Sequence, residues 1–206
     1  MRTRGRPTLA DAADINRALL DAARLTFLEQ GYDKATIEAI AAFAGVSKPT
    51  FYARFNDKSA LFAAVLEDRL SAWAARSPVE ENLTGTLSER LTLFARTTLD
   101  FLAEPEMRMF GNFVLKEGER FPEVAQIFSR ILLGHSFSLV VRQIDGAPEA
   151  LHLTPENREI VAKKLIEMVS GWLTLRNLMR ADTGPESRQL AAEECVDILL
   201  NGVLGR

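Results

Sequence analysis

One short stretch near the N-terminus, from Gly45 to Lys58, constrains the fold more than any other part of the chain. Gly45 can adopt the positive φ that ends a helix. Ser47 is a favourable N-cap, and Pro49 falls in the first turn of the next helix, where its missing N–H costs nothing. Asp57 is placed to cap another helix. The stretch therefore predicts a turn, one short helix, a second turn and the start of a further helix.

The short helix predicted after Ser47 has one apolar face and one polar face. Phe51 and Phe55 lie four residues apart, so they share a face that we expect to point inward. The side chains left on the outside are those of Thr50, Tyr52, Ala53 and Arg54. An outer face of this kind suits a groove of DNA.

A second short helix is predicted just before this stretch, with Thr36 as its cap. Its apolar positions follow helical spacing and are Ile37, Ile40, Ala41 and Ala44. A helix, an Ala-Gly-Val turn and a second short helix make up the helix–turn–helix arrangement.

With these residues the chain resembles the DNA-binding domain of TetR-family transcriptional regulators. The resemblance runs from Leu19 to Val65, roughly the first third of the chain. It is carried by Leu19-Leu20-Asp21-Ala22-Ala23, Phe27, Gly31-Tyr32, Thr36-Ile37, Ile40-Ala41, Ala44-Gly45-Val46-Ser47-Lys48, Phe51-Tyr52, Phe55, Lys58 and Leu61-Phe62. Further on, the stretch from Lys116 to Phe128 is similar to the AefR-like subgroup of the same family.

The expected DNA contacts come from the N-terminal arm, the two short helices and the start of the next helix. They are Arg4, Arg6, Thr36, Ser47, Lys48, Thr50, Tyr52, Arg54 and Lys58. We expect Lys48 and Thr50 to approach bases, and the resemblance implies that Tyr52 and Lys58 hold phosphates. For Tyr52, packing on the first helix is the competing expectation.

Residues 1–10 are interpreted as a flexible basic arm that contains Arg4-Gly5-Arg6. Two arginines on an extended backbone suit a narrow minor groove, but a solvated tail that attracts phosphates without specificity is the alternative. Residues 1–60 hold nine Lys or Arg against seven Asp or Glu, whereas residues 61–206 hold sixteen against twenty-one. A mildly basic N-terminal part on an acidic body fits local contact with DNA.

The remaining pattern is helical throughout, and we expect an all-α fold of about nine helices. Beyond the motif, helices are predicted over residues 58–75, 105–118, 123–144, 154–181 and 186–204, after a first helix over 11–30. Another helix is predicted to start at Thr86, with apolar positions at helical spacing as far as Phe101. A break at Ser77-Pro78 suggests the domain boundary. The expected domains are the arm at 1–10, a helix-turn-helix domain at 11–76 and a helical ligand-binding and dimerisation domain at 77–206.

The last two predicted helices carry apolar stripes broad enough to cover more than one neighbour. We expect a homodimer seam there, formed by Val161, Leu165, Leu175, Cys195, Ile198 and Leu199. The resemblance supports this expectation, since TetR-family dimers join through their last two long helices. Deep burial inside one chain is the alternative. Cys195 is interpreted as a small buried apolar residue rather than as a nucleophile.

The middle helices carry more large apolar side chains than a small bundle needs, so we expect a ligand pocket. Its residues are Met109, Phe110, Phe113, His135, Met168, Trp172 and Arg176. A solid core is the alternative for the apolar members, as is a core imidazole for His135. A pocket of this kind predicts a hydrophobic or aromatic small-molecule effector.

The sequence lacks the sets of residues that other classes of function require. With two histidines and one cysteine there is no structural zinc set, and no nucleophile elbow, phosphate loop or dinucleotide fingerprint occurs. We therefore expect no enzyme, no metal and no cofactor. No run of about 18 apolar residues occurs, so we expect no membrane span and a cytoplasmic protein.

Taken together, the sequence predicts a transcriptional repressor that binds an inverted-repeat DNA operator and is released by an effector. The alternative is an all-helical module that binds a small molecule or a protein and whose helix-turn-helix is only structural.

Overall fold

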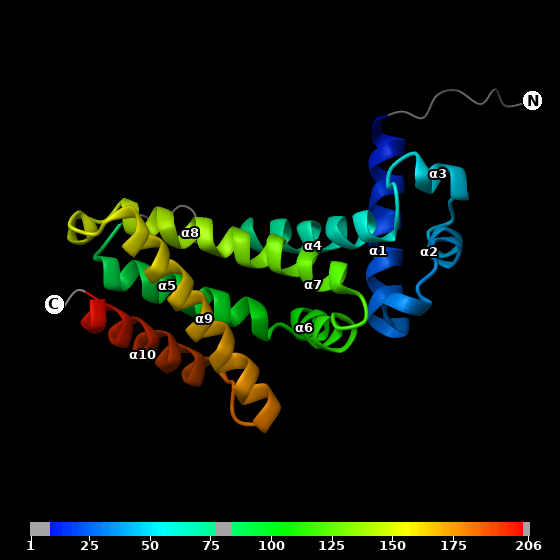
Figure 1. The fold of residues 1–206 in the computed structure, drawn as a ribbon. Coiled ribbons are helices and arrows are strands. Elements are labelled where there is room, and N and C mark those ends of the chain that lie inside the picture. Colours follow the sequence, from blue (N-terminus) through cyan, green and yellow to red (C-terminus); the bar gives the residue numbers. More distant parts are fainter. Residues whose placement is uncertain (1–8, 77–83, 204–206) are drawn as a thin grey trace, which may run out of the picture. The chain divides into compact units, whose positions relative to one another are not determined.

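The computed structural model of this 206-residue chain describes residues 9–76 and 84–203 (Figure 1). Its α-helices are α1 (Leu9–Lys34), α2 (Ile37–Phe43), α3 (Lys48–Tyr52), α4 (Lys58–Ala74), α5 (Leu87–Ala103), α6 (Pro105–Glu117), α7 (Pro122–Phe128), α8 (Gly134–Asp145), α9 (Pro155–Met179) and α10 (Pro185–Val203). A π-helical turn, η1 (Ser129–Leu133), joins α7 to α8, and a 3₁₀ turn, η2 (Pro148–Ala150), follows α8. Across both described ranges there is no strand, which confirms the all-α fold class.

The helix boundaries follow the predicted caps closely. If α7, η1 and α8 are counted as one continuous helix, the described ranges hold nine helices, as expected. Two details differ from the prediction. Gly31 has a φ of +83° and breaks α1, but a last turn continues beyond it to Lys34. The helix expected over 123–144 contains the π-helical turn, which inserts extra backbone into the regular helix.

The described residues cluster into two compact units. The first contains the chain up to Ser71 together with Met109–Ile131, and the second contains Ala72–Arg108 and the chain from Leu132 onward. The unit boundaries fall inside α4, α6 and η1, so the middle of the chain contributes to both units. The break expected at Ser77-Pro78 lies outside the described residues, and the domain limits at 10 and 76 stay predictions.

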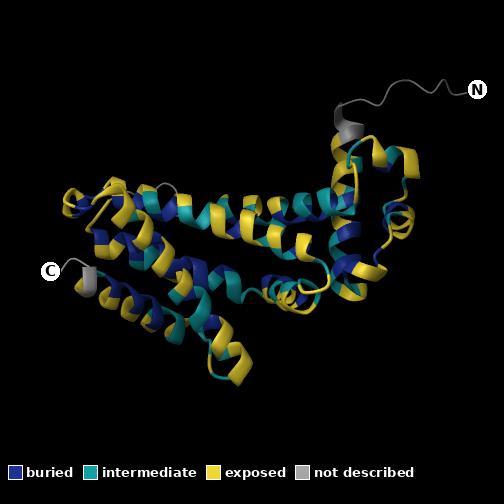
Figure 2. Ribbon diagram, viewed as in Figure 1, coloured by how far each residue is buried: buried dark blue, intermediate teal, exposed yellow. Residues whose placement is uncertain are grey.

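An aromatic cluster forms the core of the first unit. The ring of Phe62 on α4 contacts Phe27 on α1 at 5.4 Å between centroids and Phe113 on α6 at 5.6 Å. Phe110 also lies against Phe62, at 6.3 Å. The segment that starts at Met109 therefore supplies two of the rings around which α1 and α4 pack. Figure 2 colours the ribbon by burial, with buried residues in dark blue.

The second unit is built around α5, which contacts α8, α9 and α10. Leu91, Phe94 and Leu99 of α5 are completely buried in its core. A buried arginine lies at one edge of this core: the Nε of Arg90 donates to the Gln143 side-chain oxygen at 3.0 Å. A Cβ at Gly146 would lie 2.8 Å from a terminal nitrogen of Arg90, so a larger residue there would require the guanidinium to shift.

One helical stretch in the described ranges, Pro122–Asp145, is long and apolar enough to cross a membrane by length and composition alone. Arg130 and Arg142 lie along it, and its residues Val140 and Ile144 are buried against protein. A single helix that meets these two criteria is weak evidence, and the stretch is not a membrane span.

Candidate nucleic-acid interface

The helix α2 is held by its cap and by two buried side chains. The Thr36 hydroxyl accepts a hydrogen bond from the Ala39 N–H at 3.1 Å, and Ile40 and Ala41 are buried. Gly45 then adopts a φ of +69°, which turns the chain toward α3 and confirms the conformation expected of this glycine. Thr36 itself is exposed, and the contact of this helix start with phosphates stays a prediction.

The helix α3 is a single turn that is capped at its N-terminal end and anchored by one buried side chain. The Ser47 hydroxyl oxygen accepts from the Thr50 N–H at 3.3 Å and exchanges a hydrogen bond with the Thr50 hydroxyl at 2.7 Å. Pro49 lies in the first turn as predicted. Phe51 is completely buried, so it anchors one face of α3 inward and determines which side chains of this short helix point out.

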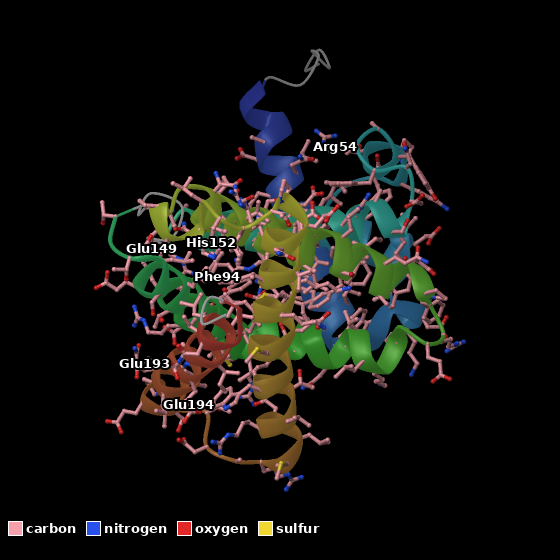
Figure 3. All side chains as sticks on the ribbon, turned by 60° about the vertical axis from the view of Figure 1, so that its left-hand side comes forward. Arg54, Phe94, Glu149, His152, Glu193 and Glu194 are labelled. Carbon is pink, nitrogen blue, oxygen red and sulfur yellow. The ribbon has the colours of Figure 1, made fainter. Side chains whose placement is uncertain are left out.

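The outward face of α3 carries the side chains expected to meet DNA. Lys48 and Ala53 are exposed, and Tyr52 is 46% exposed, with its ring 5.4 Å from that of Phe51. Thr50 and Arg54 are half-buried. Arg54, labelled in Figure 3, follows α3 directly and donates from its guanidinium to the Thr50 carbonyl at 3.4 Å. The role of each side chain at DNA stays a prediction.

A charged contact that the sequence did not predict lies on this surface. The ammonium of Lys48 donates to a carboxylate oxygen of Glu38, the second residue of α2. The hydrogen bond from Lys48 lowers the pKa of Glu38, and the same bond raises the pKa of Lys48. The Lys48 ammonium also lies 6.0 Å from the centre of the Tyr52 ring. An acid in a first helical turn is visible in the sequence, but its partner ten residues later is not.

Lys58, the last of the residues expected to bind a DNA phosphate, lies at the start of α4. One Asp57 carboxylate oxygen accepts from the Ala60 N–H at 2.7 Å and from the Ser59 hydroxyl at 2.6 Å, and these bonds lower the pKa of Asp57. The ammonium of Lys58 donates to the Tyr32 carbonyl at 2.5 Å. Burial lowers the pKa of Lys58. Lys58 therefore joins the end of α1 to α4, and its phosphate contact stays a prediction.

Arg4 and Arg6, the two arm residues expected to reach DNA, lie outside the described residues. Of the other seven, Thr36, Ser47, Lys48, Thr50, Tyr52 and Arg54 all come from α2, α3 and the turns beside them. Lys58 starts α4, with its ammonium directed to α1.

The six residues expected at the dimer seam divide by exposure. Val161, Leu165, Cys195 and Leu199 are buried in the second unit, where they pack in its own core. Leu175 is 59% exposed and Ile198 is 64% exposed. Four large apolar side chains outside the expected set are also exposed on α9 and α10, namely Ile160, Leu178, Met179 and Leu190. The seam stays a prediction that the exposed members support.

The seven residues expected at the ligand pocket divide between the two units, three in the first and four in the second. Phe110 and Phe113 belong to the aromatic core of the first unit, and Met109 is exposed. In the second unit Met168 and Trp172 pack against the core, and the Arg176 guanidinium lies 5.2 Å from the Trp172 ring centre. His135 is half-buried on α8. Their convergence on one pocket stays a prediction.

Two hollows on the described part of the surface are lined by other residues. One lies along α5 and α10, beside Arg96 and Glu193, and the other along α4 and α7, beside Ala63 and Gln126. Among the described residues no group of three His, Cys, Asp or Glu is placed to hold a metal ion.

The chain matches known regulators along most of its length. Residues 19–65 match the model of the bacterial regulatory proteins of the tetR family, and residues 89–202 match that of the AefR-like transcriptional repressor C-terminal domain. The HTH-type transcriptional repressor BepR of Brucella suis is 38% identical over 181 residues, which is 82% of this chain and 83% of BepR. The HTH-type transcriptional repressor Rv1474c of Mycobacterium tuberculosis is 38% identical over 90 residues, 42% of this chain and 45% of that protein.

Solved structures agree with this assignment. The flavonoid-responsive regulator FrrA superposes with a TM-score of 0.77 and 28% identity, over 92% of this chain and 97% of FrrA. The AefR-like match covers more than half of the chain, and the relationship to BepR extends through both units. The chain therefore belongs to the TetR family of transcriptional regulators.

Proposed function

We propose that this protein is a repressor that binds an inverted-repeat operator as a homodimer and leaves it when an aromatic or hydrophobic small molecule binds. The observation that carries the proposal is the arrangement of α3. Phe51 is buried completely while Lys48, Tyr52 and Ala53 face outward, so a rigid one-turn helix presents basic and hydroxylated side chains to solvent. A helix presented in this way fits the major groove.

The two-fold symmetry of the proposed complex rests on α9 and α10. Leu175, Leu178 and Met179 leave the end of α9 apolar and exposed, and Ile198 does the same on α10. Large apolar side chains exposed along two neighbouring helices favour a protein–protein contact. A dimer with a two-fold axis would place two copies of α3 in successive major grooves, about 34–36 Å apart, which requires an inverted repeat.

The effector class is proposed from the second unit and from the relatives. Trp172 offers a half-buried aromatic face with the Arg176 guanidinium beside it, which suits a flat aromatic molecule that carries an acceptor. FrrA is named as flavonoid-responsive, and BepR is named as a repressor. An effector of this kind would act from the cytoplasm, where the operator lies.

The test is a mobility-shift assay on the region upstream of the protein's own gene, repeated from low to high salt. We expect a discrete complex whose affinity falls linearly with the logarithm of salt concentration. A mutated inverted repeat should abolish the complex, and an unrelated duplex of equal length serves as the control. Equal affinity for both duplexes at every salt concentration would contradict operator recognition.

A further inference from the structure

The ion pair between Glu38 and Lys48 joins the first turn of α2 to the first turn of α3 on the proposed DNA-binding surface. Both side chains are open to solvent, at 61% for Glu38 and 52% for Lys48. Between Thr36 and Arg54 the sequence holds only three charged residues, which are Glu38, Lys48 and Arg54. An acid therefore neutralises one of the two cations that the stretch from Thr36 to Arg54 offers to a polyanion.

An acid at this point weakens binding to phosphates, because phosphates repel it and because it compensates the charge of Lys48. Glu38 lies in the first turn of α2, where a negative charge stabilises the helix. An acid at another position of that turn would stabilise the helix in the same way without reaching Lys48. The contact with Lys48 instead holds a donor and an acceptor side by side at one point on the surface. Such a pair matches the edge of a base pair better than it matches a phosphate.

We propose that Glu38 is a specificity-determining residue which, together with Lys48, reads one G·C base pair in the major groove of each half-site. This inference rests on the proposed function, since it requires α3 to enter the groove. The edge of a G·C pair presents guanine N7 and O6 as acceptors beside the cytosine N4 amino donor. The ammonium of Lys48 donates to guanine, and the Glu38 carboxylate accepts from cytosine.

The same geometry discriminates against an A·T pair. There the ammonium finds only the adenine N7 acceptor, and the thymine O4 acceptor beside the adenine amino group repels the carboxylate. An A·T pair places the thymine O4 acceptor where cytosine offers its N4 donor, and the adenine N6 donor where guanine offers its O6 acceptor. The Glu38 carboxylate and the Lys48 ammonium then each face the wrong group. Glu38 contributes to recognition mainly by penalising the wrong sequences, at the cost of part of the non-specific attraction.

The experiment is selection from a pool of random-sequence duplexes by the full-length wild-type protein and its variants Glu38→Ala, Glu38→Gln and Lys48→Met. For the wild type we expect one G·C pair in each half-site whose change to A·T weakens binding about tenfold. Glu38→Ala should reduce this preference to about twofold. It should also tighten binding to random duplex and steepen the salt slope by about one, because Lys48 is released to phosphate.

The other variants separate base reading from charge. Glu38→Gln keeps an acceptor oxygen, so it should retain part of the G·C preference while its affinity for random duplex rises as in Glu38→Ala. Lys48→Met should lose the guanine preference. Glu67→Ala is the matched control, since it removes an equal charge from an exposed position on α4. It should leave the selected sequence unchanged, and circular dichroism should show native helix content in every variant.

Three results would overturn the inference. If the wild type selects a sequence that Glu38→Ala selects equally well, Glu38 reads no base, while the proposed function stands. If random-duplex affinity rises but the G·C preference does not change, Glu38 only balances charge. If the wild type selects no sequence at all, the proposed function fails, and the inference fails with it.

Discussion

The ammonium of Lys58, the first residue of α4, donates a hydrogen bond to the backbone carbonyl of Tyr32 at 2.5 Å and lies 4.3 Å from the centre of the Tyr32 ring. The contact joins two chain segments that are 26 residues apart. The Tyr32 ring lies tilted against that of Phe121, with 5.2 Å between the ring centres, and Arg120 pairs with Asp33 at 2.9 Å. The end of α1, the start of α4 and the turn before α7 therefore meet in the first unit.

The first prediction concerns the two roles that this contact assigns to Lys58. Lys58→Ala removes a charged hydrogen bond and a cation–π contact, so it should lower the free energy of unfolding by about 1–2 kcal/mol. If Lys58 also holds a phosphate, the variant should bind all duplexes more weakly and show a salt slope smaller by about one. Urea denaturation and binding titrations at several salt concentrations measure the two effects separately. Unchanged affinity and slope would leave Lys58 with the structural role alone.

The second prediction concerns alkaline pH. Burial raises the pKa of Tyr32 to about 12 from its usual value of 10.0. A raised pKa stabilises the fold fully below pH 10, and this contribution is lost as the pH rises toward 12. The free energy of unfolding should fall by roughly 2 kcal/mol over that window. Tyr32→Phe should show a shallower fall, measured by urea denaturation at pH 9 to 12, and an equal slope in both proteins would contradict the assignment.

The third prediction compares two neighbouring residues on α3. Phe51→Ala empties a completely buried site and should cost about 3–5 kcal/mol of stability. Tyr52→Ala lies at an exposed position and should change stability by less than about 1 kcal/mol, yet weaken operator binding. Thermal melts and shift assays on both variants check this. Tyr52→Phe, which keeps the ring and loses the hydroxyl, tests whether the hydroxyl binds a phosphate.

The fourth prediction uses the exposure of adjacent residues on α10 to locate the dimer seam. Ile198→Glu places a charge at a 64% exposed position, so it should give folded monomers that lose specific DNA binding. Leu199→Glu places the charge in the second unit's own core and should destabilise the fold by several kcal/mol. Sedimentation and circular dichroism distinguish the two outcomes. An Ile198→Glu protein that is still dimeric would place the seam elsewhere.

The fifth prediction concerns the effector. The chain has two tryptophans, and Trp73 is buried against Phe101 with 4.7 Å between ring centres, so Trp172 is the more accessible reporter. A flat aromatic acid such as a hydroxycinnamate should quench Trp172 fluorescence and weaken operator binding. Trp172→Gln should lose both responses and keep its ligand-free DNA affinity. Quenching that survives in Trp172→Gln would place the effector elsewhere.

Local sequence signals were enough to predict most of the helices and the helix-turn-helix. Thr36, Ser47, Thr86 and Thr154 each cap a helix in the structure, and Gly45 adopts the expected positive φ. These features depend on interactions between residues three or four positions apart, so a short window of sequence contains both partners. The inward orientation of Phe51 follows from the same local pattern.

The sequence by itself therefore determined the all-α class, most of the helix ends and the family. Only the tertiary structure decided that Phe110 and Phe113 enter the core of the first unit, that Glu38 pairs with Lys48 and that Lys58 binds the Tyr32 carbonyl. Each of these contacts joins residues of separate helices. An amphipathic pattern shows that a face is buried but does not show which helix covers it, because many apolar partners satisfy the hydrophobic effect equally well.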